Sequence, residues 1–190
     1  ALAICGGVSL GVLAAIRPRS GLDRFSTGLA MLGVSFPPFW LGIVLIMVFS
    51  VNLGWFPSSG IATYGAEGDI ASRLRHLVLP AVTLAALQLA IYMRFTRSSL
   101  IEALDQDFVR TARAKGLAER VVVLRHAFRN ALIPLLTIAS FSIKSLVGGA
   151  VFVEVVFAWP GLGRLTVDSV FARDYPVVLG LTLLFSVVTI

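Results

Sequence analysis

The chain is poor in the residues that disulfide-bonded or metal-binding domains use. It has one cysteine and two histidines among 190 residues, so it can form no internal disulfide and offers no His/Cys spacing of a zinc site. Charged residues make up only 14% of the chain, about half of their share in an ordinary soluble domain. The composition therefore excludes a disulfide-stapled fold and a zinc finger, and we expect no metal site.

Apolar residues replace the missing charges. The AVILMFWYC set supplies 57% of the sequence and the mean hydropathy is +0.92, which indicates lipid as the solvent. A spanning helix needs about 20 apolar residues, and the candidate spans are 1–16, 29–56, 77–93, 131–159 and 176–190. We expect a tilt or a kink at Pro37-Pro38, and entry turns at Pro80 and Pro134. The sequence predicts an all-α polytopic membrane protein with one transmembrane domain over residues 1–190.

Basic residues are distributed unevenly over the predicted loops. Because successive loops alternate sides, they form two sets, and one set holds eleven of the 16 basic residues against four in the other. The positive-inside rule makes the larger set cytoplasmic. This asymmetry explains most of the net charge of +6 without nucleic acid, and no basic module of a nucleic-acid-binding type is present. The cytoplasmic set is Arg17, Arg19, Arg24, Arg94, Arg97, Arg110, Arg113, Lys115, Arg120, Arg125 and Arg129.

The predicted cytoplasmic loop 94–130 is too long to be a simple connection between packed helices. Its sequence continues the preceding helix to Leu104, offers N-cap residues at 105–107, and ends a second short helix at Gly116, which suits a left-handed C-cap. Apolar residues then recur at helical spacing from Leu117 to Asn130. The loop is therefore predicted to be helix, glycine corner, helix. It could rest on anionic headgroups or insert into a cytoplasmic partner, and composition alone does not decide between these.

Two stretches resemble a known family. Residues 107–117 (DFVRTARAKGL) and 125–134 (RHAFRNALIP) resemble the cytoplasmic coupling loop of the permease subunits of bacterial ABC importers for dipeptides and oligopeptides, and residues 148–163 (GGAVFVEVVFAWPGLG) are similar to a second stretch of that branch. The resemblance covers essentially the whole chain. It implies a multi-pass protein of the bacterial cytoplasmic (inner) membrane. It also implies a fragment with five visible spans, two of them clipped, out of six.

The wider importer family writes this loop as Glu-Ala-Ala, three residues and then glycine. Here Arg110-Thr111-Ala112 stands in place of Glu-Ala-Ala, while Gly116 matches. These departures favour the peptide branch over sugar, amino-acid or metal importers. The carboxylate of the general motif has no counterpart, so no contact is carried over for it.

The resemblance implies a transporter subunit that works by alternating access. Its implied partners are a second homologous permease, two ATP-binding subunits and an extracytoplasmic substrate-binding protein, which would hold most of the substrate specificity. The chain contains no Walker A loop, so it cannot cradle ATP phosphates itself. We therefore expect no catalytic residue and no cofactor in this chain, with ATP and Mg bound on the partner subunits.

The coupling loop carries the first set of candidate site residues. By the resemblance, Phe108 and Ala112 would pack into a groove of the ATP-binding subunit, basic side chains would meet its acidic rim, and Gly116 would let the backbone turn. For the basic residues the alternative is an ordinary solvated, positive-inside face. The full set is Asp107, Phe108, Arg110, Thr111, Ala112, Arg113, Lys115 and Gly116.

The predicted span 131–159 carries the second set, a candidate translocation path. Lys144 lies near mid-membrane, where a charge normally faces a cavity or a partner; it could meet a peptide carboxylate or pair with a polar group across a subunit interface. Glu154 could attract a peptide amino terminus or form hydrogen bonds in a gate loop or interface. Gly148 and Gly149 would permit close helix approach.

Two other functions fit the composition less well. A membrane hydrolase needs a nucleophile and a base in one site, but His76 is predicted outside and His126 inside the cell. An ion-coupled secondary transporter could use the buried Lys144. It predicts inverted repeats and interrupted helix pairs, which we do not find, and it leaves the helical loop unexplained.

Overall fold

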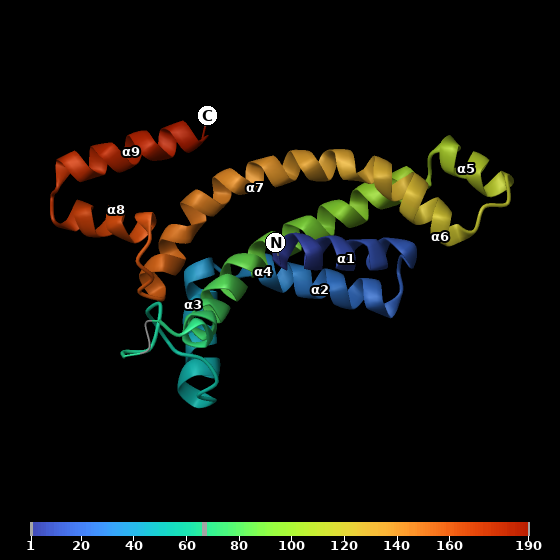
Figure 1. The fold of residues 1–190 in the computed structure, drawn as a ribbon. Coiled ribbons are helices and arrows are strands. Elements are labelled where there is room, and N and C mark those ends of the chain that lie inside the picture. Colours follow the sequence, from blue (N-terminus) through green and yellow to red (C-terminus); the bar gives the residue numbers. More distant parts are fainter. Residues whose placement is uncertain (1, 66–67, 190) are drawn as a thin grey trace. The chain divides into compact units, whose positions relative to one another are not determined.

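The computed structural model describes residues 2–65 and 68–189, with the side chains of 141, 143–149 and 189 left out of the description. Within these residues every regular element is helical (Figure 1), which confirms the predicted all-α fold. The elements are α1 (Leu2–Ile16), α2 (Gly21–Ser35), α3 (Pro38–Leu45), the π-helical η1 (Ile46–Asn52), α4 (Ile70–Leu104), α5 (Asp107–Ala114), α6 (Glu119–Val121), the π-helical η2 (Val122–Ala127), α7 (Phe128–Val156), α8 (Leu162–Phe171) and α9 (Tyr175–Thr189).

The chain divides into two compact units. The first unit comprises Ala1–Ser35 and Ala85–Ser142, and the second comprises Phe36–Leu84 and Ile143–Ile190. The long helices α4 and α7 each contribute one part to either unit. The single transmembrane domain predicted over residues 1–190 stays a prediction.

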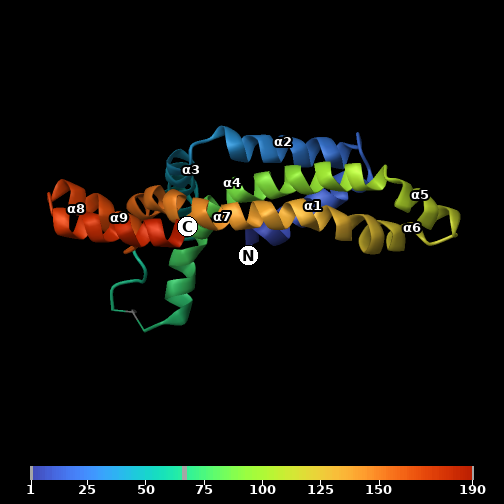
Figure 2. The same ribbon diagram turned by 90° about the horizontal axis from the view of Figure 1, so that it is seen from above.

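In the first unit, α1 and α2 lie side by side along α4, as both views show (Figures 1 and 2). Small residues make this contact, since Ala14, Ala30 and Ala90 are buried together with Met93. A second cluster, from Ala15 and Leu100 through to Ala131, packs the end of α4 against α5, η2 and the start of α7. Membrane helices associate through close packing rather than hydrophobicity, and these small side chains allow it.

Two glycines bring α1 directly against the backbone of α4. A Cβ on Gly7 would lie 2.6 Å from the carbonyl oxygen of Leu89, and a Cβ on Gly11 would lie 2.7 Å from the carbonyl oxygen of Met93 and 2.6 Å from the Cβ of Thr96. No side chain fits at these distances. The spacing of four residues places both glycines on one face of α1, in the small-xxx-small arrangement of membrane helix pairs.

We expect Gly7→Val and Gly11→Val to separate α1 from α4 and to lower the stability of the first unit by about 1 to 3 kcal/mol, the usual cost of overpacking. Thermal unfolding in detergent, followed by circular dichroism, measures the effect. Gly28→Ala on α2 is the matched control, because nothing lies within 4 Å of a Cβ built there. Equal melting temperatures for the three variants and the unaltered protein would contradict this account of the α1–α4 contact.

The second unit packs around Phe157, which is 1% exposed and contacts Leu79 and Val153 in one apolar cluster. Partly buried side chains of α3, η1 and α4 complete this cluster. Helices α8 and α9 form an antiparallel pair in the same unit (Figures 1 and 2). Gly42 of α3 allows this packing, because a Cβ there would lie 3.1 Å from the ring of Phe157.

Two of the described helical segments, Ile70–Leu104 and Glu119–Ser140, are long and apolar enough to span a membrane, and α2 with α3–η1 adds a third if the pair counts as one broken span. The break between α2 and α3 lies at the predicted Pro37-Pro38 position, and the span predicted over 29–56 stays a prediction. Helices α1 and α9 are apolar but shorter than a span. The five-span organisation stays a prediction.

The entry turns predicted at Pro80 and Pro134 are wrong. Both prolines lie inside long helices, α4 and α7. Each removes one backbone donor from its helix, a loss that membrane helices tolerate because neighbouring groups satisfy the freed carbonyl. The helices begin earlier than the prolines indicate, α4 at Ile70 and α7 at Phe128.

Candidate functional site

The loop 94–130 is folded as the sequence predicts. Helix α4 continues to Leu104, α5 begins at Asp107, and Gly116 has a φ of +74°. The Gly116 N–H donates to the Arg113 carbonyl at 2.9 Å, and the Leu117 N–H donates to the Ala112 carbonyl at 3.4 Å. This pair of bonds is the Schellman ending of a helix, which needs a left-handed residue at the position of Gly116. The glycine corner is therefore confirmed.

Helix α5 is strongly amphipathic, and its inner face packs against the protein's own core. Val109 is fully buried and Ala112 is 5% exposed, both in the cluster that includes Leu100 and Val122. Ala112 therefore anchors α5 to the chain itself, which corrects the expectation that it enters a partner's groove. Its small size hid this role, because alanine suits an internal helix contact and a partner groove equally well.

The outer face of α5 carries the remaining candidate residues. Phe108 is 39% exposed although it is a large apolar side chain. Arg110 and Asp107 pair loosely at 3.4 Å with most of both side chains exposed. Thr111 donates to the Asp107 carbonyl at 3.0 Å, and Lys115 is exposed at the end of the helix. The structure thus gathers one aromatic and two basic side chains on a face that its own core leaves open.

Arg113 has an internal partner. Its Nη2 donates to Glu119 Oε1 at 2.7 Å and its Nε donates to Oε2 at 3.1 Å, a two-pronged contact across the glycine corner. These hydrogen bonds raise the pKa of the Arg113 guanidinium above its ordinary value. Such a planar fork fixes geometry as well as charge. Arg113 therefore fastens α5 to α6, and less of its charge is available to an acidic rim than the sequence analysis expects.

These contacts make the segment from Asp107 to Ala127 a rigid projection of the first unit. We call it the docking segment. It is joined to the end of α4 by two residues and runs directly into the start of α7, and its inner face shares one core with both helices. The docking segment therefore shares its packing with the ends of both α4 and α7.

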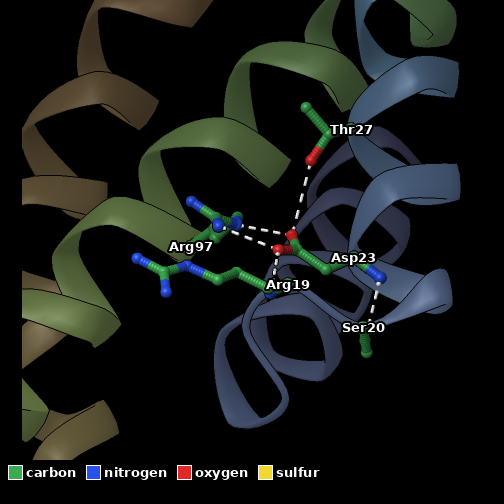
Figure 3. Close-up of polar contacts among 5 residues, drawn as sticks. All are labelled: Arg19, Ser20, Asp23, Thr27 and Arg97. Carbon is green, nitrogen blue, oxygen red and sulfur yellow. Dashed lines mark hydrogen bonds and ion pairs between the residues drawn. The ribbon is translucent and has the colours of Figure 1, made fainter.

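A largely buried ion pair between α2 and α4 was not predicted from the sequence. Asp23 of α2 accepts hydrogen bonds from Arg97 Nε at 2.6 Å and Nη2 at 2.9 Å (Figure 3). The backbone N–H of Arg19 donates to the same carboxylate at 2.8 Å and the hydroxyl of Thr27 donates at 3.4 Å. The Asp23 side chain is only 6% exposed. The pair therefore fixes α2 against α4 at the predicted cytoplasmic side.

A sequence signal for this pair exists. Asp23 is the one acidic residue in the first 65 positions, and it lies close to three arginines, Arg17, Arg19 and Arg24. A lone carboxylate at the start of a membrane helix needs a partner. What the sequence does not show is that Arg97, 74 positions later, supplies it.

Glu154 lies in the second unit on the last turn of α7, and its side chain contacts the start of α8. Its Oε2 accepts a hydrogen bond from the Arg164 N–H at 2.9 Å, so it satisfies one of the free donors at the helix N-terminus. A Cβ at Gly161 would collide with this carboxylate, and one at Gly163 would lie 2.7 Å from the Val151 Cα. Of the two roles considered for Glu154, hydrogen bonding in a loop matches these contacts. Contact with a substrate stays a prediction.

The remaining candidates of the translocation path lie outside this description. Lys144, Gly148 and Gly149 fall on residues 143–149 of α7, whose side chains are not among those described.

An all-α chain with long apolar helices and a rigid, basic helical projection has the build of a membrane transport subunit. The family of inner membrane components of binding-protein-dependent transport systems matches residues 7–190, and the chain belongs to this family. The resemblance found in residues 107–117, 125–134 and 148–163 is therefore confirmed.

Relatives with curated descriptions agree with this placement. The chain is 48% identical over 189 residues to the oligopeptide transport system permease protein AppB of Bacillus subtilis (strain 168), and this match covers 100% of the chain and 60% of AppB. It is 47% identical over 184 residues to the glutathione transport system permease protein GsiC of Escherichia coli (strain K12), with coverage of 97% and 57%. The chain thus spans roughly three fifths of the length of these relatives.

Proposed function

We propose that the chain is part of a permease that moves peptides or similar small solutes across the bacterial inner membrane, driven by ATP hydrolysis on partner subunits. The family match over residues 7–190 carries this proposal. The names of AppB and GsiC support peptides and glutathione as the substrate class. The partners are two ATP-binding subunits, a second permease and an external substrate-binding protein.

The docking segment supplies the mechanical link in this proposal. Closure of the ATP-binding subunits moves a groove that holds the outer face of α5, and the rigid corner at Gly116 passes this motion to α4 and α7. This is a rigid-body mechanism, in which the packed interface switches between two arrangements. A flexible loop would lose the motion, whereas the core formed by Val109, Ala112 and Val122 keeps α5 fixed.

The exposed side chains define the groove that would receive α5. Phe108 is an apolar anchor for a pocket, and Arg110 and Lys115 require acidic residues around it. Buried aromatic anchors dominate the binding energy of such interfaces, and rim charges act mainly on association rate. We therefore assign docking affinity to Phe108, and orientation to Arg110 and Lys115.

Co-purification tests the proposed function. The full-length protein, expressed with its own ATP-binding and permease partners, should purify in mild detergent as one complex. Its ATPase activity should rise when the external binding protein is added with a dipeptide, an oligopeptide or glutathione. A stable protein that transports these solutes under an ion gradient, with no ATPase attached, would establish the secondary transporter instead.

A further inference from the structure

A cavity of about 690 Å³ lies in the first unit, between α2 and α4. Four arginines line it: Arg19, Arg24, Arg94 and Arg97. All four belong to the set that the positive-inside rule places at the cytoplasmic face. The cavity is separate from the docking segment, since no residue from 107 to 127 lines it.

The cavity is strongly positive because Asp23, the one acidic residue that lines it, is already paired with Arg97. The Asp23 carboxylate accepts two hydrogen bonds from the Arg97 guanidinium, one from the Arg19 backbone N–H and one from the Thr27 hydroxyl. In the part of the chain that the structure describes, the guanidinium groups of Arg19, Arg24 and Arg94 have no carboxylate partner. Figure 3 shows the side chains of Arg19 and Arg97 extending on the same side of Asp23. An anion would therefore meet uncompensated positive charge.

The other part of the lining is apolar. Met31, Met93 and Phe95 line the same cavity as the arginines. Met31 is 62% exposed and Phe95 is 47% exposed, although both are large apolar side chains. Arginines beside exposed apolar side chains, at the edge of a membrane helix pair, match an amphiphile that has an anionic head and a hydrocarbon tail.

We propose that this cavity binds the phosphate headgroup of an anionic phospholipid of the inner leaflet. The phosphate is held by Arg24 and Arg94, with Arg19 beside them, and an acyl chain lies along Met31 and Phe95. A small soluble anion would use the arginines but leave these apolar side chains in contact with water. The Asp23–Arg97 pair forms the floor of the site and keeps α2 and α4 at the spacing that the headgroup needs.

Native mass spectrometry of the full-length protein in detergent tests this site, with dioleoylphosphatidylglycerol as the probe. We expect the double variant Arg24→Gln/Arg94→Gln to bind this lipid about thirtyfold more weakly, since each arginine near the membrane surface contributes about fivefold in affinity. Arg24→Lys/Arg94→Lys keeps both charges and should bind within about threefold of the unaltered protein.

The matched control is Arg120→Gln/Arg125→Gln, which removes two exposed cytoplasmic charges that do not line the cavity. It should bind phosphatidylglycerol like the unaltered protein. An equal loss of phosphatidylglycerol binding in the control and in the cavity variant would overturn the proposal. So would equal binding of dioleoylphosphatidylcholine, or displacement of phosphatidylglycerol by an equal concentration of inorganic phosphate. Unchanged circular dichroism of the cavity variant shows that any loss is not due to unfolding.

Discussion

Replacing Gly116 with proline is expected to uncouple ATP hydrolysis from solute uptake while membrane insertion stays intact. Proline fixes φ near −65°, whereas Gly116 has a φ of +74° and donates its N–H to Arg113 at 2.9 Å. The variant therefore loses both the corner and the hydrogen bond that closes α5. We expect uptake by proteoliposomes of the complete transporter to fall by about tenfold or more, because a misplaced α5 weakens docking by at least about 1.4 kcal/mol.

Gly116→Asn is the matched control. Asparagine tolerates the left-handed conformation better than other residues with a side chain, and nothing lies within 4 Å of a Cβ at this position. This variant should retain most of the uptake. Normal uptake by the proline variant, or equal loss in both variants, would contradict the role of the corner in coupling.

Arg97→Gln is expected to destabilise the protein more than any other single change at the predicted cytoplasmic face. It leaves the Asp23 carboxylate, 6% exposed, without its principal partner. Removing one partner of a fully buried pair costs about 3 to 5 kcal/mol. Because the Arg97 side chain is 32% exposed, we expect about 2 kcal/mol. Thermal unfolding in detergent should show this as a melting temperature lower by several degrees.

The double variant Asp23→Asn/Arg97→Gln separates the pair from the packing around it. Removing both charges avoids a buried unpaired carboxylate, so its stability should lie above that of Arg97→Gln alone. Arg94→Gln, at an exposed position one turn earlier on α4, should leave the melting temperature within about a degree. Additive losses in the double variant would show that Asp23 and Arg97 do not interact.

The parts of the structure that local chemistry determines could be predicted from the sequence. The end of α4 at Leu104, the start of α5 at Asp107 and the left-handed Gly116 each follow from residues within one helical turn. Left-handed glycine at a helix end is a backbone preference that acts over a few residues. The predicted N-cap chemistry of residues 105–107 is not seen, because the N-cap of α5 is Gln106 and it makes no side-chain capping hydrogen bond. The family resemblance extended this local prediction to the whole chain, and the match over residues 7–190 confirms it.

The parts that depend on distant contacts could not be predicted. An alanine such as Ala112 has no pattern that distinguishes a partner groove from the protein's own core, and the pairing of Asp23 with Arg97 joins positions 74 residues apart. The helix starts near Pro80 and Pro134 were misplaced because tertiary packing carries a helix through a proline that local preference would put at its start. Glycines 7 and 11 gave no sign of their helix partner for the same reason.

The central claim is that the outer face of α5 is held by a separate ATP-binding subunit, and site-specific photo-crosslinking tests it most directly. A photoreactive amino acid at position 108 of the full-length protein, within the complete transporter in membranes, should crosslink to the ATP-binding subunit, and the yield should change when ATP is added. The same group at position 133, an exposed site on α7, should label lipid. Labelling of lipid alone from position 108, with or without ATP, would contradict the account.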